Sequence, residues 1–405
     1  MKFCRQSRSG ARPRTSEHEA GDRKMLKKIP FNAPFIVGKE LFYISQAVLE
    51  GNLAGDGRFT KACHEWLETT FHAKKALLTT SCTTALEMSA ILCDTQKDDE
   101  IVMPSFTFVS TANAFVLRGA KIRFVDIRGD TLNIDEKRIE EAITPKTKAI
   151  VPVHYAGVGC EMDAIMDIAE RHGLVVVEDA AQGVNATYKG AFLGTIGHLG
   201  TYSFHETKNF ISGEGGALII NDEKYFERAE IIREKGTNRS QFFRGELDKY
   251  TWVDIGSSYL PSEIIAAFLL AQLEESARIT RVRSAIYTYY AQNLKPLEER
   301  GMIRLPFCPS TCQQNAHLFY IIVLTDLEDR DRLIQHLKER NIHAVFHYVP
   351  LHLSPMGRKM GYQDGNLPLT EDLSDRLLRL PCYFELTKED QDRVIDEIYA
   401  FFGKM

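Results

Sequence analysis

The sequence contains no apolar run close to the roughly 20 residues that a membrane-spanning helix needs. Its amino-terminal residues also lack the apolar stretch of a secretory signal. Neither sign of charge predominates, since 50 basic and 55 acidic side chains leave a formal net charge of -5. The sequence therefore predicts a cytoplasmic protein that binds neither a membrane nor a nucleic acid.

Cysteine pairs at a repeated spacing are also missing. The eight cysteines are scattered through apolar segments, and only Cys308 and Cys312 lie close together. Zinc sites usually carry a second cysteine pair, or histidines at a set spacing. His343, His347 and His352 are near one another but match no common zinc pattern. We therefore expect reduced thiols and no metal site.

The composition is that of a globular protein, with 44% hydrophobic and 26% charged residues. At roughly 100 to 200 residues per domain, a chain of 405 residues predicts two or three units. Residues 1–24 are polar, rich in Arg and Ser and without periodicity, so we expect a disordered extension. Met25 begins the patterned chain, and we interpret it as the natural start.

Two helices are expected before the main pattern begins. After Gly38, Leu41, Ile44 and Val48 recur at helical spacing, and Gly51 fits the left-handed position that ends a helix. The second helix is expected to bury a face of four residues, Phe59, Cys63, Trp66 and Leu67.

Short apolar segments then alternate with helical patterns. Five segments have the composition of buried strands: 76–78, 101–103, 122–127, 149–153 and 174–177. Four segments between them have helical periodicity: 84–93, 107–117, 135–143 and 162–172. This alternation predicts an α/β fold whose large, mostly parallel sheet is covered by helices on both faces.

The pattern changes after about residue 270. Amphipathic helices over 271–299 lead to four further expected elements, a strand at 318–324, a helix over 329–340, a strand at 344–346 and a helix over 389–402. We therefore expect a large domain over 25–270 and a smaller α+β domain over 271–405.

A carboxylate, an amide and a lysine follow two of the strands. Asp179 and Gln182 belong to the run EDAAQ directly after the strand 174–177, and Lys208 follows a Ser-Phe-His segment. Functional groups of open α/β sheets gather at the carboxyl ends of strands. A lysine there is a candidate Schiff-base nucleophile, and a carboxylate can keep a pyridine nitrogen protonated. Together they predict pyridoxal 5′-phosphate, although either residue alone is more simply a helix cap or a surface lysine.

Two further segments complete this pattern. The run GEGG at 213–216 precedes a strand at 217–220 and opens no helix, which disfavours a Rossmann dehydrogenase. The run TSCTTAL at 80–86 lies between a strand and a helix, where N–H groups and the helix dipole can bind a phosphate. By itself such a run is more often an ordinary cap. Its place in the first β/α unit makes it a candidate phosphate site.

These motifs resemble the DegT/DnrJ/EryC1/StrS family of sugar aminotransferases. The resemblance runs from about residue 29 to the C-terminus and rests on four motifs, SFHxxK with GEGG, EDAAQ, the SxTxAL turn and PSFTFVST at 104–111. Five further segments resemble the members that aminate C4 of a dTDP-linked keto sugar: FNAP (31–34), HETKN (205–209), GTNRSQFFRG (236–245), DIGSSYLPS (254–262) and FHYVPLH (346–352).

The resemblance implies an aspartate-aminotransferase-like fold of type I, a homodimer with shared active sites, and L-glutamate as the amino donor. Lys208 would bind the cofactor and Asp179 would pair with its pyridine nitrogen, both as catalytic residues. Seven further cofactor contacts are implied: Gln182 at the ring hydroxyl, Phe108 and Ala181 at the ring faces, and Cys82, Thr83, Ser203 and Ser258 at the phosphate, Ser258 from the neighbouring subunit.

The same resemblance implies contacts to a nucleotide sugar. His347 and His352 would lie near the sugar. Asn238, Arg239 and Arg244 are candidates for the diphosphate because a guanidinium binds phosphate bidentately. For all five side chains, a solvated or internally satisfied position is an equally simple interpretation.

The sequence departs from the family at two places. Cys82 stands where many members have glycine, and residues 256–260 (GSSYL) replace a GYNYR-like run. Lys208 separates the chain from related sugar dehydratases, which carry histidine at that position.

By this resemblance, the expected reaction is amino transfer from L-glutamate to C4 of dTDP-4-dehydro-6-deoxy-D-glucose. It gives dTDP-4-amino-4,6-dideoxy-D-galactose for cell-surface polysaccharide biosynthesis. Two alternatives stay open: an aminotransferase for a C3 ketone or a UDP sugar, and a cofactor-bearing regulatory protein without turnover. The complete set of Asp179, Gln182 and Lys208 speaks against the regulatory protein, which has no need of an activated lysine.

Overall fold

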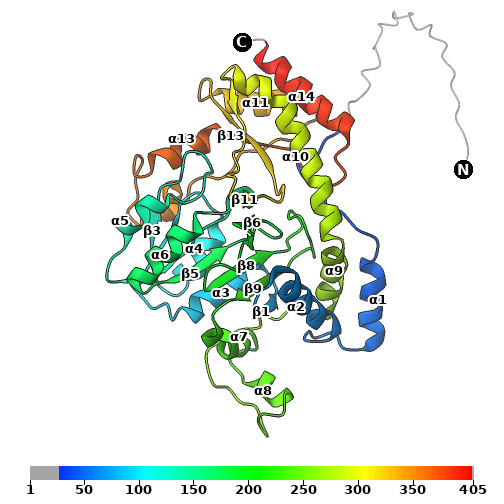
Figure 1. The fold of residues 1–405 in the computed structure, drawn as a ribbon, viewed down its shortest axis with the longest axis vertical. Coiled ribbons are helices and arrows are strands. Elements are labelled where there is room, and N and C mark those ends of the chain that lie inside the picture. Colours follow the sequence, from blue (N-terminus) through cyan, green and yellow to red (C-terminus); the bar gives the residue numbers. More distant parts are fainter. Residues whose placement is uncertain (1–26, 404–405) are drawn as a thin grey trace, which may run out of the picture.

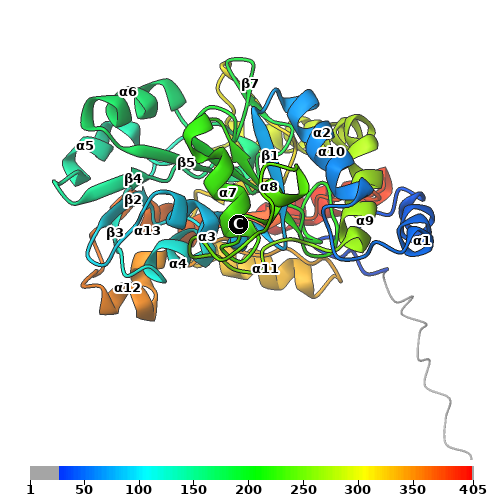
Figure 2. The same cartoon turned by 90° about the horizontal axis from the view of Figure 1, so that it is seen from below.

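The computed structural model describes residues 27–403, so the expected extension over 1–24 and the interpretation of Met25 lie outside the described residues. The main sheet has seven strands in the order β1-β9-β8-β5-β4-β2-β3. It lies in the middle of the molecule (Figures 1 and 2). Its strands are β1 (Lys75–Thr79), β2 (Glu100–Pro104), β3 (Lys121–Val125), β4 (Thr147–Ile150), β5 (Val175–Asp179), β8 (Leu199–Ser203) and β9 (Gly216–Ile220).

The expected α/β fold with a mostly parallel sheet is confirmed. Strands β3, β2, β4, β5 and β8 run parallel to one another, while β9 runs antiparallel to both β8 and β1. All five predicted strands are present, although β3 ends at Val125 and β4 at Ile150, short of the predicted bounds. The sheet is buried on both sides, which is why its strands are continuous apolar runs.

Helices cover both faces of the sheet. Figure 2 shows α5 and α6 along one side and α3 and α4 along the other. One core contains residues of α2 (Arg58–Phe71), α6 (Met162–His172) and α9 (Glu263–Glu274). The other contains residues of α3 (Cys82–Leu92), α4 (Val109–Val116) and α7 (Phe226–Arg233). The predicted helix over 135–143 is split into η1 (Glu136–Arg138) and α5 (Ile139–Ala142).

Helix α1 (Glu40–Glu50) is present as predicted, but only part of the apolar spacing that predicts it is covered. It ends as predicted at Gly51, whose φ of 77° is left-handed. Leu41 is 78% exposed and Val48 is 51% exposed, whereas Ala47 is buried. The helix packs on α9, and the position of that neighbour, which the local spacing does not reveal, decides which face is covered. In α2, three of the four predicted face residues are buried, namely Phe59, Cys63 and Leu67.

A smaller antiparallel sheet lies at the upper end of the molecule in Figure 1. It is formed by β10 (Ile303–Arg304), β12 (Phe319–Val323) and β13 (Leu377–Leu380). Three helices share its apolar core: α10 (Ser276–Glu299), α11 (Asp329–Lys338) and α14 (Lys388–Phe402). The predicted strand at 344–346 is wrong, because this segment bonds to the sheet only through an isolated bridge between Val345 and Arg379.

The remaining elements are short. They are β6 (Thr187–Tyr188), β7 (Ala191–Phe192), β11 (Cys312–Gln313), α8 (Arg239–Phe243), α12 (Pro355–Lys359), α13 (Pro368–Arg376), η2 (Tyr155–Gly157), η3 (Glu223–Tyr225) and η4 (Leu351–Leu353). Over residues 27–403, every helix is too short or too polar to cross a membrane.

The division into two domains at residue 270 stays a proposal. Helix α9 runs through that position and packs in a core of the large sheet. Along α10, Ile279 still belongs to this core, whereas Ile286 belongs to the core of the smaller sheet. Ile29, near the start of the described chain, also packs in the core of the smaller sheet.

A buried carboxylate joins α2 to α9. Gly57 precedes α2 and has no side chain that could cap it. The carboxylate of Glu263, 2% exposed, accepts hydrogen bonds from the N–H groups of Gly57 (3.0 Å), Phe59 (2.8 Å) and Thr60 (3.2 Å). It also accepts one from the Thr60 hydroxyl. The negative charge is further favoured at this position by the dipole of α2.

Replacing Glu263 by glutamine should lower the free energy of unfolding by about 1–3 kcal/mol, because an amide nitrogen cannot accept hydrogen bonds from these N–H groups. Urea unfolding of the two proteins measures the difference. Glu274→Gln is the matched control, since that carboxylate ends α9 and contacts the side chains of Lys39 and Tyr43. An equal loss in both variants would contradict the capping role.

Candidate active site

The carboxyl ends of β5 and β8 bring the two predicted motifs together. Asp179 ends β5 and Ser203 ends β8, and the two strands are parallel neighbours. Lys208 lies in the connection from β8 to β9, which backbone hydrogen bonds between 204–206 and 213–215 close into a hairpin. The residues therefore gather at one edge of the sheet, as predicted from the strand ends.

The Asp179 carboxylate is 5% exposed and is held by two hydrogen bonds. Its Oδ2 accepts from the hydroxyl of Thr111 at 2.7 Å, and its Oδ1 accepts from the backbone N–H of Ala181 at 3.1 Å. The Thr111 oxygen lies 2.8 Å from the hydroxyl of Thr107. In residues 27–403 no Lys, Arg or His forms an ion pair with Asp179. A buried carboxylate in this state suits a cationic partner such as a protonated pyridine nitrogen.

The surroundings of the Lys208 amine favour its neutral form. Burial lowers the pKa of Lys208 below its ordinary value of 10.5, and the positive charge of Arg379 acts in the same direction, while Cys82 and Asp179 oppose it. Within the described chain, Nζ has no hydrogen-bond or ion-pair partner. A lowered pKa increases the neutral fraction of the amine, which is the form that attacks an aldehyde.

Gln182 lies between the backbone and an aromatic cluster. Its Oε1 accepts from the N–H of Ala156 at 2.8 Å, and its Nε2 donates to the hydroxyl of Tyr348 at 3.0 Å. The second N–H of Nε2 is left for a ligand. Burial raises the pKa of Tyr348, so its hydroxyl stays protonated. Phe108, whose ring centroid lies 6.4 Å from that of Tyr348, is 58% exposed although it is aromatic.

The N-terminus of α3 has the features of a phosphate site. Ser81 and Thr84 cap the helix reciprocally, with distances of 3.2 and 3.1 Å. The backbone N–H groups of Cys82 and Thr83 have no acceptor in the described chain. The Thr83 hydroxyl lies 2.8 Å from that of Ser110. Burial raises the pKa of the Cys82 thiol, so Cys82 offers an amide and not a thiolate to an anion.

The last residue of GEGG, Gly216, must be a glycine because the N-terminus of α3 approaches it closely. It pairs with Ser203 of β8 and with Thr79 of β1. A Cβ at this position would lie 2.4 Å from the backbone nitrogen of Cys82. The glycine therefore lets the N-terminus of α3 approach the sheet beside Ser203, whose hydroxyl has no partner among residues 27–403. The two amides and this hydroxyl fit the phosphate of a cofactor.

The two predicted sugar-contacting histidines have different surroundings. Nδ1 of His347 is hydrogen-bonded to the Tyr155 hydroxyl, at a distance of 3.0 Å. Nε2 of His347 has no partner within residues 27–403. Burial lowers the pKa of His347, and the charges of Arg379 and Lys208 contribute. His352 is fully buried, and Ser105 and Glu371 occupy its two ring nitrogens at 2.7 and 3.0 Å. Of these two histidines, only His347 keeps a ring nitrogen without a partner in residues 27–403.

The predicted diphosphate residues lie on a segment around α8, at the lower end of the molecule in Figure 1. Asn238 accepts from the N–H of Thr251 at 2.8 Å. The other partners are acidic: Arg239 lies 3.6 Å from Glu234, and Arg244 lies 2.7 Å from both Glu230 and Glu246. None of these partners belongs to the site around Lys208. Ser258, on the same segment, is exposed.

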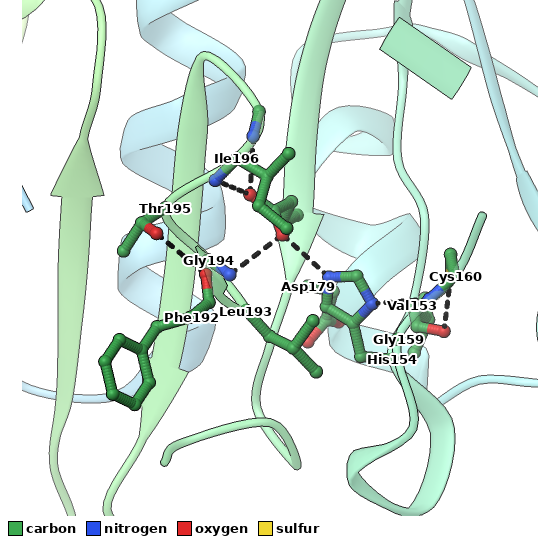
Figure 3. A network of polar contacts seen from close by, with 12 residues as sticks. Val153, His154, Gly159, Cys160, Asp179, Phe192, Leu193, Gly194, Thr195 and Ile196 are labelled. Atoms are coloured by element: carbon green, nitrogen blue, oxygen red, sulfur yellow. Dashed lines mark hydrogen bonds and ion pairs between the residues drawn. The ribbon is translucent and has the colours of Figure 1, made fainter. Parts of the chain in front are cut away.

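The sequence analysis missed the role of Glu178, which precedes Asp179 and is fully buried. Its carboxylate accepts hydrogen bonds from three backbone N–H groups, those of Gly194, Ile196 and Gly197, at 2.6–2.8 Å. Figure 3 shows His154 beside this turn. Nδ1 of His154 accepts from the N–H of Cys160 at 3.1 Å, so Nε2 carries the proton and donates to Glu178 at 2.8 Å. This network fixes the end of β5.

Other residues that the sequence analysis missed surround the amine. Nδ1 of His317 lies 3.1 Å from Oδ1 of Asn209, the residue after Lys208. Burial lowers the pKa of His317 well below the ordinary value. Arg379 of β13 interacts electrostatically with Lys208. Both come from the C-terminal third of the chain, and no local motif signals them. Over residues 27–403 no cluster of three His, Cys, Asp or Glu side chains could hold a metal ion.

Comparison with known proteins identifies relatives along nearly the whole chain. A model of the DegT/DnrJ/EryC1/StrS aminotransferase family matches residues 36–399. The spore coat polysaccharide biosynthesis protein SpsC of Bacillus subtilis is 32% identical over 378 residues, which cover 91% of this chain and 96% of that protein. A pleiotropic regulatory protein of Geobacillus stearothermophilus is 37% identical over 306 residues, covering 75% of this chain and 78% of that protein.

The fold and the cofactor are confirmed by these comparisons. Spr1654 of Streptococcus pneumoniae superimposes with a TM-score of 0.86 in its PLP-form and 0.87 in its PMP-form, each at 26% identity. The superposition covers 93% of this chain and 99% of that one. Together with the family match, it confirms the aspartate-aminotransferase-like fold of type I and pyridoxal 5′-phosphate as the cofactor.

The rate at which cofactor-free protein captures pyridoxal 5′-phosphate should depend on the protonation of Lys208. Because only the neutral amine attacks the aldehyde, the rate should rise with pH and level off below pH 10.5, the ordinary lysine value. Stopped-flow absorbance of the aldehyde measures it. A rate that still climbs tenfold per pH unit through 10.5 would contradict the lowered pKa of Lys208.

Proposed function

Because the chain belongs to the DegT/DnrJ/EryC1/StrS aminotransferase family, we propose that it transfers the amino group of L-glutamate to C4 of dTDP-4-dehydro-6-deoxy-D-glucose. The products are dTDP-4-amino-4,6-dideoxy-D-galactose and 2-oxoglutarate. The observation that carries this proposal is the Lys208 amine, unpaired in the described chain and lowered in pKa, at the same sheet edge as Asp179 and Gln182. The five segments that resemble C4-aminating members support the sugar.

Lys208 is the proposed proton carrier. The bound cofactor supplies an electron sink for the carbon that carries the amino group. The neutral Lys208 amine takes the proton from that carbon and returns it, a general acid–base role worth about 10²- to 10⁴-fold in rate. Burial, which lowers the pKa of Lys208, favours the neutral form for this task.

The other proposed roles orient the cofactor. Asp179, held by Thr111 and the N–H of Ala181, keeps the pyridine nitrogen protonated. The free N–H of Gln182 binds the ring hydroxyl. Phe108 and Ala181 would contact the two faces of the ring. Three groups would bind the phosphate, the N–H groups of Cys82 and Thr83 and the hydroxyl of Ser203.

We propose a cytoplasmic homodimer in which the segment around α8 reaches the partner's site. This segment exposes large apolar side chains: Phe243, Leu247, Tyr250, Trp252, Val253 and Ile255. Helix α1 exposes four more: Leu41, Phe42, Val48 and Leu49. Apolar surface of this kind is characteristic of interfaces. In the dimer, Ser258 would contact the phosphate, and Asn238, Arg239 and Arg244 the diphosphate, while His347 and His352 serve the sugar from the same chain.

The relatives support a role in polysaccharide biosynthesis, since SpsC of Bacillus subtilis bears that description. One relative also keeps an alternative open, because the pleiotropic regulatory protein of Geobacillus stearothermophilus is 37% identical. A cofactor-binding regulator without turnover would have no use for an amine poised beside Asp179. Amination at C3, or of a UDP sugar, is the nearer alternative within the same class.

The proposed reaction is tested by incubating the purified protein with pyridoxal 5′-phosphate, L-glutamate and dTDP-4-dehydro-6-deoxy-D-glucose. NMR should identify an axial amino group at C4 of the sugar. An equatorial amine, or conversion of glutamate without any sugar product, would sink the substrate assignment and keep the aminotransferase. Absence of 2-oxoglutarate with every keto sugar tried would favour the regulatory alternative.

The variant Lys208→Ala tests the proposed role of Lys208. It should lose both halves of the reaction, because the proposed proton carrier is removed, while it retains the fold and noncovalent binding of the cofactor. Circular dichroism and cofactor absorbance check the last two points. Substantial turnover by this variant would contradict the proposed role of Lys208.

A further inference from the structure

Asn315 lies in the loop between β11 and β12 and is 1% exposed. Its side-chain amide is satisfied by backbone groups. Nδ2 donates to the carbonyls of Gln182 and Val184, both at 2.8 Å. Oδ1 accepts from the N–H of His317 at 3.0 Å. Because an N–H occupies the amide oxygen, the two N–H groups of Nδ2 are both available to the segment that follows β5.

The backbone of the same residue holds the segment that carries the reactive lysine. The Asn315 carbonyl accepts from Nδ2 of Asn209 at 2.8 Å, and Asn209 directly follows Lys208. A carbonyl can only accept, so this bond fixes the orientation of the Asn209 amide, and Oδ1 of Asn209 faces His317. That oxygen lies 3.1 Å from Nδ1 of His317, which therefore carries the proton. Asn209 is 8% exposed, so water has little access to these two bonds.

The loop around Asn315 is anchored on both of its sides. Arg283 of α10 is buried, and its guanidinium donates to the carbonyls of Ala316 at 3.1 Å and His317 at 2.6 Å. A Cβ at Gly157 would lie 2.1 Å from Oδ1 of Asn315, so the amide fills the space beside this glycine. A side chain enclosed in this way cannot change its rotamer without breaking contacts, and Asn315 is a fixed point between the two segments.

We propose that Asn315 is a positioning residue that sets the placement of Lys208 relative to Gln182. The inference rests on the proposed function, in which Lys208 binds the cofactor and Gln182 contacts the ring hydroxyl. The two residues come from different connections of the sheet, Gln182 from the one after β5 and Lys208 from the one between β8 and β9. Asn315 is hydrogen-bonded to both connections, to the first through its side chain and to the second through its carbonyl.

The relative placement matters because both residues meet one rigid molecule. The hydroxyl and the aldehyde of pyridoxal 5′-phosphate are on neighbouring carbons of the ring, so Gln182 and Lys208 engage both groups only at a matching separation. The side chain of Gln182 is held by the N–H of Ala156 and the hydroxyl of Tyr348. The Lys208 amine has no partner in residues 27–403. The placement of Lys208 therefore depends on the backbone of its connection, which Asn315 holds through Asn209.

The first test is hydrogen exchange of the cofactor-free protein, read by mass spectrometry. Asn315→Ala should speed exchange by about 5- to 150-fold in both connections, 180–186 and 204–213, because each loses a hydrogen bond or its support. Asn209→Ala should speed exchange in 204–213 alone. Asn293→Ala is the matched control, since its Nδ2 donates to the carbonyl of Tyr289 within α10 at 2.8 Å, and it should change neither connection.

Two results of this experiment overturn the proposal. Faster exchange in only one connection of Asn315→Ala would mean that Asn315 does not join the two segments. An equal increase in strands β2 and β4 would mean that Asn315 supports the fold as a whole and has no particular effect on Lys208 and Gln182.

The second test measures the equilibrium affinity for pyridoxal 5′-phosphate with and without Lys208. With Lys208 present, Asn315→Ala should weaken the affinity by about 5- to 150-fold, because the two groups no longer match the ring. In the Lys208→Ala protein the same substitution should have a loss at least about fivefold smaller, because noncovalent binding does not require the match. Asn209→Ala should show the same dependence on Lys208, so the test does not rely on the folding of Asn315→Ala.

The affinities separate a failure of this inference from a failure of the proposed function. An equal loss with and without Lys208, in Asn315→Ala or in Asn209→Ala, overturns the positioning role. If Lys208→Ala alone binds the cofactor as tightly as the wild-type protein, Lys208 does not form the link, and the proposed function fails together with the inference that rests on it.

Discussion

Two adjacent carboxylates at the end of β5 govern the site, because a buried carboxylate must find donors or a cation. Alternation along the strand directs Glu178 and Asp179 to opposite sides. Glu178 is satisfied within the protein, by three backbone N–H groups and the Nε2–H of His154. Asp179 has two hydrogen bonds and no cation in the described chain. The first carboxylate therefore holds the strand end, and the second is the one that we propose for the pyridine ring of the cofactor.

Local patterns were sufficient to predict the parts of the site that follow directly from strand ends. Asp179 ends an apolar strand and Gln182 follows it closely. Lys208 follows β8, the parallel neighbour of that strand, so the sheet brings the three residues to one edge. The cap at Ser81 was visible for a similar reason, since it is specified by residues within one turn. The run GEGG was visible as well, but the need for glycine at 216 comes from Ser81 and Cys82, which are distant in the chain. The family match and the fold agree with these predictions.

The rest depended on contacts between segments far apart in the chain. Spacing could identify α1 but not the packing on α9 that leaves Leu41 exposed. The predicted strand at 344–346 failed because a single bridge to Arg379 replaces a ladder. His352 looked like His347 in the sequence, yet Ser105 and Glu371 occupy both of its ring nitrogens. No local pattern signals Arg379, which lies beside Phe346 and has no acidic partner in residues 27–403 only because of how the chain folds.

The claim that everything else requires is that Lys208 is the amine that binds the cofactor. Borohydride reduction of the holoenzyme, followed by peptide mass spectrometry, tests it directly because reduction makes the link between amine and cofactor permanent. We expect one phosphopyridoxyl group per chain, on the peptide that contains Lys208. A stoichiometric label on a different lysine, or no label on a protein that retains the cofactor, would contradict the account.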